Sequence, residues 1–273
     1  MSRKQTYTLL LVITVVGLYF LEKYITRENI KFPKKQTVLQ PVNTYFEFDK
    51  TYLPTSTTGR VITHNYYTLS YNEPYEQAEW VAYELQKNQL SKNEFERPYF
   101  VLDKKVKSRS AHWRNYKNSG YDKGHLCPAG DRRFNYNAFE ETFLTSNISP
   151  QNHDFNAGIW NRLEQKTRYW AKKYDGVFVI TGGVLHKGLK TIGDEKVSVP
   201  NYFYKIIADN SNQKLKTIAF LIPNKPISNS FYEYVITIDE IEKRTGIDFF
   251  SNLPDALENK IESTIDLNSW GKR

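Results

Sequence analysis

The chain of 273 residues contains a single cysteine, Cys127, so its fold cannot depend on covalent cross-links within the chain. One cysteine also excludes a zinc site built from several cysteines. The chain is long enough to bury a self-sufficient hydrophobic core, and its 40% apolar and 25% charged residues exclude disorder and a mostly membrane-embedded fold. Its 20 tyrosines, 16 phenylalanines and 5 tryptophans suit a core rich in β-strands.

The formal net charge of +8 is unevenly distributed along the chain. Residues 1–43 contain seven basic and two acidic side chains, and residues 97–133 contain ten basic and three acidic ones. A solvated surface is the ordinary explanation of a positive net charge. The concentration of cations in residues 97–133 favours an anion-binding face instead.

The N-terminus has the pattern of a membrane-directed segment. Two basic residues, Arg3 and Lys4, precede an uncharged and largely apolar run over residues 8–21, as in a secretory signal. A charged pair follows this run where a cleaved signal would have small residues. We therefore expect residues 1–26 to form an uncleaved signal anchor, with a cleaved signal peptide and a buried core helix as the alternatives.

The orientation of this segment is ambiguous from sequence. More basic residues follow the apolar run than precede it, which favours a cytoplasmic C-terminal side, whereas the signal-type N-terminus favours export. We expect a membrane-anchored protein with an extracytoplasmic globular domain, or a secreted one if the segment is cleaved. Residues 27–43 are polar, lysine-rich and interrupted by Pro33 and Pro41, so they predict a linker.

The remaining residues, 44–273, predict one domain in which strands and helices do not alternate regularly. This pattern indicates the α+β class. The predicted strands are Arg60–Tyr71, Val177–Ile180 and a hairpin of Tyr202–Ala208 with Leu215–Ile222. The predicted helices are Tyr75–Leu85, Asp154–Tyr174, a short one from Thr237 to Gly246, and one from Pro254 to about Thr264.

Two local patterns carry chemistry. On the helix predicted over 154–174, four side chains spaced four residues apart share one face: Asn156, Trp160, Glu164 and Arg168. Such a stripe is usually an ion-paired surface. None of the five histidines has the spacing of a zinc ligand pair, but His125 stands in the segment Asp122-Lys123-Gly124-His125. There Gly124 permits close approach of a ligand to the backbone, and Lys123 adds a cation.

The segment Asp122–His125 resembles the Asp-Arg-Gly-His signature of the DNA/RNA non-specific endonucleases, the sugar-non-specific nucleases of the ββα-metal (His-Me finger) group. Other segments match the family in order over about residues 60–262, namely Glu141–Phe143, Ser146–Gln151, Asn156 with Trp160 and Leu163-Glu164, Val199–Lys205 and Thr245–Phe250. The resemblance implies a ββα-metal nuclease fold with a central mixed or antiparallel sheet flanked by helices.

The resemblance also implies roles for individual residues. His125 matches the general base that activates the attacking water, and Asn156 matches the only direct protein ligand of the divalent metal. Glu164 matches a carboxylate that holds water around the metal. Asn147 and Asp122 match residues that support the site.

Three cations match positions that contact phosphate in the family. Arg168 matches a cation near the scissile phosphate, and Arg97 matches another phosphate-clamping arginine. Lys123 replaces the arginine that the family commonly has in the signature. Lysine keeps the positive charge but loses the planar fork that binds two oxygens at once.

These assignments form a consistent mechanism for phosphodiester hydrolysis. A neutral imidazole can accept a proton near pH 7, and Mg²⁺ held by one amide keeps most of its charge. Contacts to phosphate carry no sequence information. We therefore expect an endonuclease that uses Mg²⁺, with Mn²⁺ as a substitute, and hydrolyses DNA and RNA with little sequence preference. The alternative is a non-catalytic, membrane-tethered module that binds nucleic acid or other anions, and a homodimer is left open.

Overall fold

The computed structural model describes residues 5, 14–18, 20, 50–211 and 214–271. The chain divides into two units, residues 1–45 and 46–273. Most of the predicted signal segment and all of the predicted linker lie outside the described residues, so both stay predictions, as does the domain boundary at residue 44. Among the described residues, no helix has the length and apolar character needed to cross a membrane.

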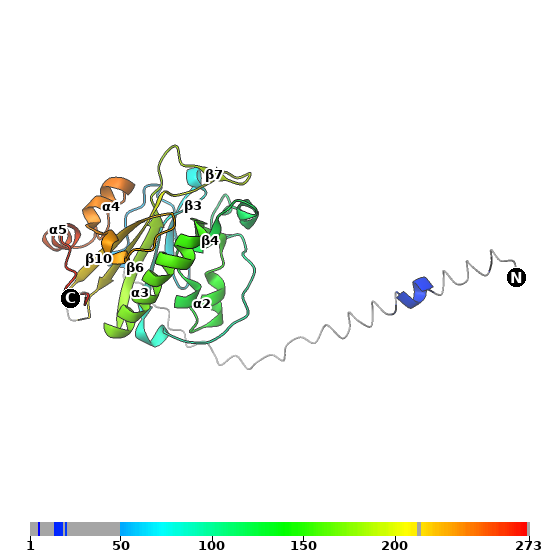
Figure 1. The fold of residues 1–273 in the computed structure, drawn as a ribbon, viewed down its shortest axis with the longest axis horizontal. Coiled ribbons are helices and arrows are strands. Elements are labelled where there is room, and N and C mark those ends of the chain that lie inside the picture. Colours follow the sequence, from blue (N-terminus) through cyan, green and yellow to red (C-terminus); the bar gives the residue numbers. More distant parts are fainter. Residues whose placement is uncertain (1–4, 6–13, 19, 21–49, 212–213, 272–273) are drawn as a thin grey trace. The chain divides into compact units, whose positions relative to one another are not determined.

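A seven-stranded sheet forms the centre of the second unit (Figure 1). Every neighbouring pair of its strands is antiparallel. In spatial order the strands are β1 (Val61–Thr63), β2 (Thr68–Asn72), β3 (Gln77–Gln86), β6 (Gly176–Gly183), β9 (Tyr202–Asp209), β10 (Lys216–Pro223) and β11 (Val235–Ile236).

Smaller elements surround this sheet. Two antiparallel pairs lie outside it, β4 (Asp122–His125) with β5 (Ile148–Gln151), and β7 (Thr191–Ile192) with β8 (Val197–Ser198). The α-helices are α2 (Tyr136–Glu141), α3 (Asn161–Lys173), α4 (Ile238–Thr245) and α5 (Asp255–Ser263). The α+β class is therefore confirmed, and the large sheet is antiparallel rather than mixed.

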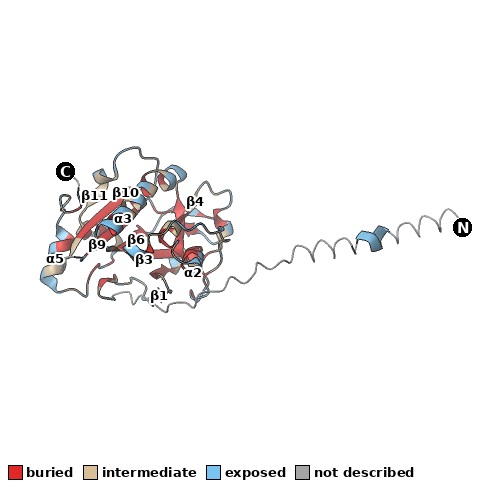
Figure 2. Cartoon of the chain, turned by 90° about the horizontal axis from the view of Figure 1, so that it is seen from below, coloured by how far each residue is buried: buried red, intermediate tan, exposed pale blue. Residues whose placement is uncertain are grey.

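The large sheet is covered on both faces, so the molecule has two main cores. In β3, the side chains of Val81 and Tyr83 join the core that also contains Trp170 of α3. The alternate side chains, Trp80 and Ala82, join the core formed with α4 and α5. Figure 1 shows α3 lying along one face of the sheet, and Figure 2 shows the central strands buried between the flanking elements.

Two of the predicted elements are wrong for reasons that follow from this architecture. The helix predicted over Tyr75–Leu85 is mostly strand β3, which is buried on both faces and therefore lacks the polar alternation of a half-exposed strand. The single strand predicted over Arg60–Tyr71 is a hairpin of β1 and β2, in which Val61 pairs with Ser70. The hairpin reverses at residues 64–67, a reversal without the glycine or proline that marks most turns.

The later elements follow the prediction. Strands β9 and β10 form the expected hairpin, with Asp209 paired to Lys216. Helix α4 begins after Thr237, whose hydroxyl accepts a hydrogen bond from the backbone N–H of Glu240, and ends at Gly246 with φ of 71°. Helix α5 follows Pro254 as expected.

The C-terminal segment is attached to α3 by Trp270, which is fully buried. Its ring packs edge-on against Trp170 with ring centroids 4.9 Å apart. The indole N–H of Trp170 donates to the carbonyl of Trp270 over 3.1 Å, and the indole N–H of Trp270 donates to the carbonyl of Thr217 in β10 over 3.0 Å. Trp270 therefore joins α3 to the sheet.

We expect Trp270→Ala to lower the free energy of unfolding by about 3–5 kcal/mol, because it removes a buried aromatic side chain and leaves a cavity against Trp170. The control is Tyr169→Ala on α3, because the Tyr169 side chain is exposed. We expect this change to lower the free energy of unfolding by less than about 1 kcal/mol. Urea unfolding followed by tryptophan fluorescence and circular dichroism measures both values. Equal costs for the two variants would contradict the role given to Trp270.

Candidate active site

The β4–β5 pair brings the two ends of the predicted signature against the segment that follows Asn147. His125 pairs with Ile148, and Asp122 pairs with Gln151. Gly124 is required here because a Cβ atom at this position would lie 2.0 Å from Oε1 of the buried Gln151 side chain. Even alanine therefore needs the two strands or the Gln151 side chain to move.

Asn147 fixes the chain immediately after His125. Its Oδ1 accepts from the backbone N–H of Cys127 over 2.8 Å, and its Nδ2 donates to the carbonyls of Cys127 and Thr142, each over 2.9 Å. The Asn147 side chain is fully buried, so these three bonds satisfy its amide. Asn147 thus holds the backbone beside His125.

The His125 ring packs against two phenylalanines. Its centroid lies 5.4 Å from the ring of Phe100 and 5.1 Å from that of Phe143, which meets it edge-on. Its Nε2 atom is enclosed and has no hydrogen-bond partner within residues 50–271 as far as they are described. Burial, and then the positive charge of Arg97, lower the pKa of His125 to about 3. The imidazole is therefore neutral and has a free nitrogen.

Two of the predicted cations gather around the same aromatic pair. The guanidinium carbon of Arg97 lies 5.7 Å from the Phe100 ring centroid and 5.5 Å from that of Phe143. Nζ of Lys123 lies 5.6 Å from the Phe100 centroid. In the described part of the chain neither cation has a carboxylate partner, so both charges are available to an anion. Phe100 and Phe143 thus hold the imidazole and two cations together.

Asn156 contacts Asp122 at the start of the signature. Its Nδ2 donates to Oδ2 of Asp122 over 3.0 Å, and Nδ1 of His153 lies 2.9 Å from the same carboxylate oxygen. This bond occupies the donor end of the Asn156 amide. Oδ1 accepts no hydrogen bond from the described residues and is the end that remains for a ligand.

The helix predicted over Asp154–Tyr174 is regular only from residue 161 onward. Residues Phe155–Trp160 wind as a wider π-helical turn, and Gly158 has φ of −96° and ψ of −106°, outside the helical region. Glycine tolerates this conformation because it has no Cβ atom. The irregular turn breaks the predicted four-residue stripe, since Trp160 is buried against Phe203 while Asn156 contacts Asp122.

Glu164 and Arg168 belong to a second cluster on the sheet side of α3. Nη1 of Arg168 lies 2.7 Å from Oδ1 of Asp131, and Oδ2 of that buried carboxylate accepts from the hydroxyl of Tyr83 over 2.9 Å. Burial raises the pKa of Glu164 to about 7, and the nearby Lys205 ammonium opposes that shift. Within the described residues, no hydrogen bond or ion pair joins this cluster to His125.

Lys205 was not among the predicted site residues. It lies in the middle of β9, is fully buried, and has its ammonium 4.8 Å from the ring centroid of Trp160. Burial lowers its pKa, whereas the Glu164 carboxylate raises it. A single lysine between apolar neighbours in a predicted central strand is the sequence feature that marks it. Asp131 and the Phe100–Phe143 pair were missed as well, because only tertiary packing brings them to the site.

The ten cations of residues 97–133 do not form one face. Arg132 is buried, donating through Nη2 to the carbonyls of Tyr66 and Glu84, so it is structural. Arg114 and Lys117 line a cavity of about 750 Å³, together with Lys190 from the segment before β7. The prediction of an anion-binding face over residues 97–133 is thus too broad.

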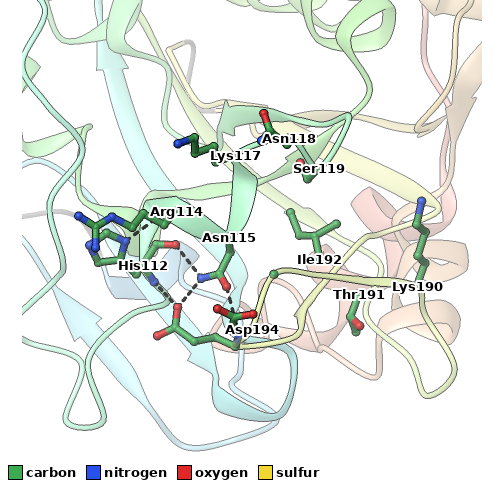
Figure 3. A pocket seen from close by; sticks show the side chains of 12 residues that line it. His112, Arg114, Asn115, Lys117, Asn118, Ser119, Lys190, Thr191, Ile192 and Asp194 are labelled. Carbon is green, nitrogen blue, oxygen red and sulfur yellow. Dashed lines mark hydrogen bonds between the residues drawn. The ribbon is translucent and has the colours of Figure 1, made fainter.

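This cavity adjoins the start of β4. Nζ of Lys190 lies 5.1 Å from the ring centroid of Tyr121, the residue before the signature. In Figure 3 the Asn115 amide lies at the centre of a hydrogen-bond network, and the ends of Lys117 and Lys190 extend away from it. Asn115 joins the loop before β4 to the turn between β7 and β8, since its Oδ1 accepts from the N–H of Glu195 over 3.1 Å.

Comparison with known proteins identifies the family. The model of the DNA/RNA non-specific endonuclease family matches residues 45–256, most of the chain. The chain belongs to this family.

Other family members resemble the chain over similar ranges. The protein named "Nuclease EXOG, mitochondrial" from Danio rerio is 35% identical over 204 residues, which are 68% of this chain and 60% of that protein. The protein named "Nuclease" from Nostoc sp. is 33% identical over 223 residues, 76% of this chain and 78% of that protein. The chain spans between 43% and 60% of the length of the vertebrate relatives from Danio rerio, Xenopus laevis and Mus musculus.

A solved structure supports the fold. The crystal structure of the EndoG/EndoGI complex contains a chain that matches with a TM-score of 0.67 and 31% identity, covering 72% of this chain and 87% of that one. The α+β fold with its antiparallel sheet is therefore shared with EndoG.

The pKa of His125 can be tested directly. We expect the imidazole of the metal-free protein to stay neutral from pH 8 to about pH 5, because burial disfavours the charged form, whereas an ordinary histidine titrates near pH 6.5. Chemical shifts of the ring in a histidine-labelled protein measure this, and His125→Gln identifies the resonance. A titration midpoint near 6.5 would show that the ring is not desolvated.

Proposed function

We propose that this protein is a metal-dependent endonuclease that hydrolyses the phosphodiester bonds of DNA and RNA with little sequence preference. The observation that carries the proposal is the neutral imidazole of His125, whose Nε2 has no partner among the described residues, next to two cations without carboxylate partners. A neutral imidazole can accept a proton from water, and the cations attract the anionic phosphate. The antiparallel pair of β4 and β5, followed in the chain by α3, supports the ββα-metal nuclease type, with α2 in the connection between the two strands.

The residues around Asn156 fit a hydrated divalent cation. Asp122 binds the Nδ2 end of the Asn156 amide, which leaves Oδ1 for a metal ion. A neutral oxygen ligand suits Mg²⁺ or Mn²⁺, which keep several of their waters. Asn156 would hold the ion in this proposal. When bound, the ion supplies positive charge that stabilises the charge developing on the phosphate.

The chain's own residues would perform the remaining steps. His125 takes the proton of the attacking water, and the Phe100–Phe143 pair keeps its ring fixed. Lys123 binds a non-bridging phosphate oxygen as a point charge, and Arg97 can bind two such oxygens through its planar guanidinium. Arg168 is held by Asp131 through Nη1 and is about one-quarter exposed, so its other N–H groups would contact phosphate from an already oriented guanidinium. Glu164 would hold water around the metal ion.

The cavity before β4 would extend the cationic surface beyond the scissile phosphate. Arg114, Lys117 and Lys190 come from two separate segments and add three positive charges to those of Lys123 and Arg97, against the two negative charges of Asp194 and Glu195 in the same lining. Glu195 is bound by the backbone N–H of His112 and the side-chain amide of Asn115. Backbone phosphates of a longer strand would bind there irrespective of base sequence.

The proposal also includes membrane anchoring through residues 1–26, an extracytoplasmic or secreted location, and a homodimer. Some relatives are mitochondrial by name.

The His125→Ala variant separates the endonuclease from a non-catalytic binding module. We expect it to lose plasmid nicking by about 10²–10⁴-fold, because the water loses its general base, while DNA binding in EDTA and the unfolding temperature change little. The matched control is His186→Ala, which removes an exposed histidine whose Nδ1 lies 2.9 Å from the neighbouring carbonyl oxygen of Lys187. Wild-type protein that binds DNA but never nicks it with Mg²⁺ or Mn²⁺ would favour the binding module.

Titration of Mg²⁺ separates the metal ligand from the phosphate clamp. We expect Asn156→Ala to raise the Mg²⁺ concentration at half-maximal nicking, with partial rescue at high Mg²⁺, because it removes the ligand oxygen. Lys123→Ala should lower the rate at saturating Mg²⁺ by about 10²-fold with little change in that midpoint, because it removes only a charge. Lys123→Arg is the control and should stay active. A shift of the metal midpoint in Lys123→Ala equal to that in Asn156→Ala, without loss at saturation, would refute the division of roles.

A further inference from the structure

A cluster of carboxylates lies between α4 and α5, on the face of the sheet opposite α3. It forms two groups of three that share one residue, and within each group a carboxylate oxygen of every member lies within 4.8 Å of the others. One group is Asp239, Glu242 and Glu262, and the other is Asp248, Glu258 and Glu262. Four carboxylates from α4, α5 and the segment between them thus converge on Glu262.

Glu262 is the reason to regard this cluster as a binding site. The residue is only 6% exposed, and its Oε1 atom has no hydrogen-bond partner in the described part of the chain. A buried carboxylate oxygen without a partner costs free energy unless a cation or a donor reaches it. It points towards the other four carboxylates rather than towards a lysine or arginine.

The surrounding charges do not compensate for this cluster. Residues 237–263 contain seven acidic and three basic side chains in a protein whose net charge is +8. Arg244 is 2.8 Å from Glu240, which belongs to neither group. No ion pair reaches the five carboxylates from any described residue.

Burial and the repulsion between neighbouring carboxylates both disfavour the charged form of Glu262. Burial first, and then Glu242 and Glu258, raise the pKa of Glu262. Among the described residues, one backbone donor relieves the cluster, since the N–H of Phe249 donates to Oε1 of Glu242 over 2.8 Å. That bond also fixes the Glu242 side chain in position.

We propose that this carboxylate cluster binds a calcium ion that joins α4 to α5. Ca²⁺ takes six to eight oxygen ligands in a flexible geometry, and carboxylates from three segments can supply them together with backbone oxygens or water. Ile241 of α4 and Ile261 of α5, next to the cluster in sequence, both belong to the core on this face of the sheet. The bound ion stabilises the packing of both helices and takes no part in phosphodiester cleavage.

The experiment is thermal unfolding of the full chain, kept in detergent, in EDTA and in increasing free Ca²⁺. We expect the unfolding temperature to rise by about 5–10 °C at a hundredfold excess of Ca²⁺ over its dissociation constant. Glu262→Gln should abolish the rise. Glu242→Gln, which keeps an acceptor for the N–H of Phe249, should reduce it as well and serves if Glu262→Gln does not fold. The control Glu240→Gln on α4 should retain the full rise.

The Asn156→Ala variant distinguishes this site from the proposed catalytic metal site. The rise should persist in Asn156→Ala, and nicking by Glu262→Gln with Mg²⁺ should equal that of the wild type. The proposal is wrong if the wild type shows no rise up to about 10 mM Ca²⁺, where even weak protein calcium sites are filled. It is equally wrong if Glu262→Gln responds like the wild type. Neither result would affect the proposed nuclease activity.

Discussion

Burial of the large antiparallel sheet on both faces constrains the position of every other element. Because alternate side chains of β3 enter different cores, one face has to be covered by α3 and the other by α4 and α5. Trp170 attaches α3 to its face, and Trp270 attaches the C-terminal segment to α3. The π-helical turn before α3 contacts β4 through Asn156 and Asp122, which is where the candidate active site lies.

The candidate site places a neutral imidazole beside two cations that form no ion pair with the described residues. Aromatic packing by Phe100 and Phe143 desolvates His125 and keeps it neutral, while the same rings hold Lys123 and Arg97 nearby. An acidic residue in this group would pair with the cations and protonate the imidazole more readily. Asp122 of β4 instead binds Asn156 and His153, and Asp131 in the loop after β4 binds Arg168.

The buried charges behind α3 depend on one another. Lys205 lies within a strand that is otherwise apolar, and its charge is tolerated because Glu164 and Asp131 are near. Burial raises the pKa of Glu164 to about 7, so its charge in turn depends on Lys205 and Arg168. The nearby carboxylates of Glu164 and Asp131 give a physical reason for a lysine in a central strand.

The sequence by itself determined the family, the α+β class, the β9–β10 hairpin and the helices that begin after Thr237 and Pro254, because local turn and capping residues specify them. It also indicated His125, Asn156 and Lys123, since their signature and order are visible along the chain. Only the tertiary structure decided that residues 77–86 are a strand, because a strand covered on both faces has no polar alternation to reveal it. It also decided that Arg132 is buried and that Asn156 leaves the stripe of α3, because these positions depend on contacts between segments distant in sequence. Sequence spacing specifies periodic elements, whereas the π-helical turn at Gly158 and the pairing of Arg168 with Asp131 exist only once the sheet, helix and loop are packed together.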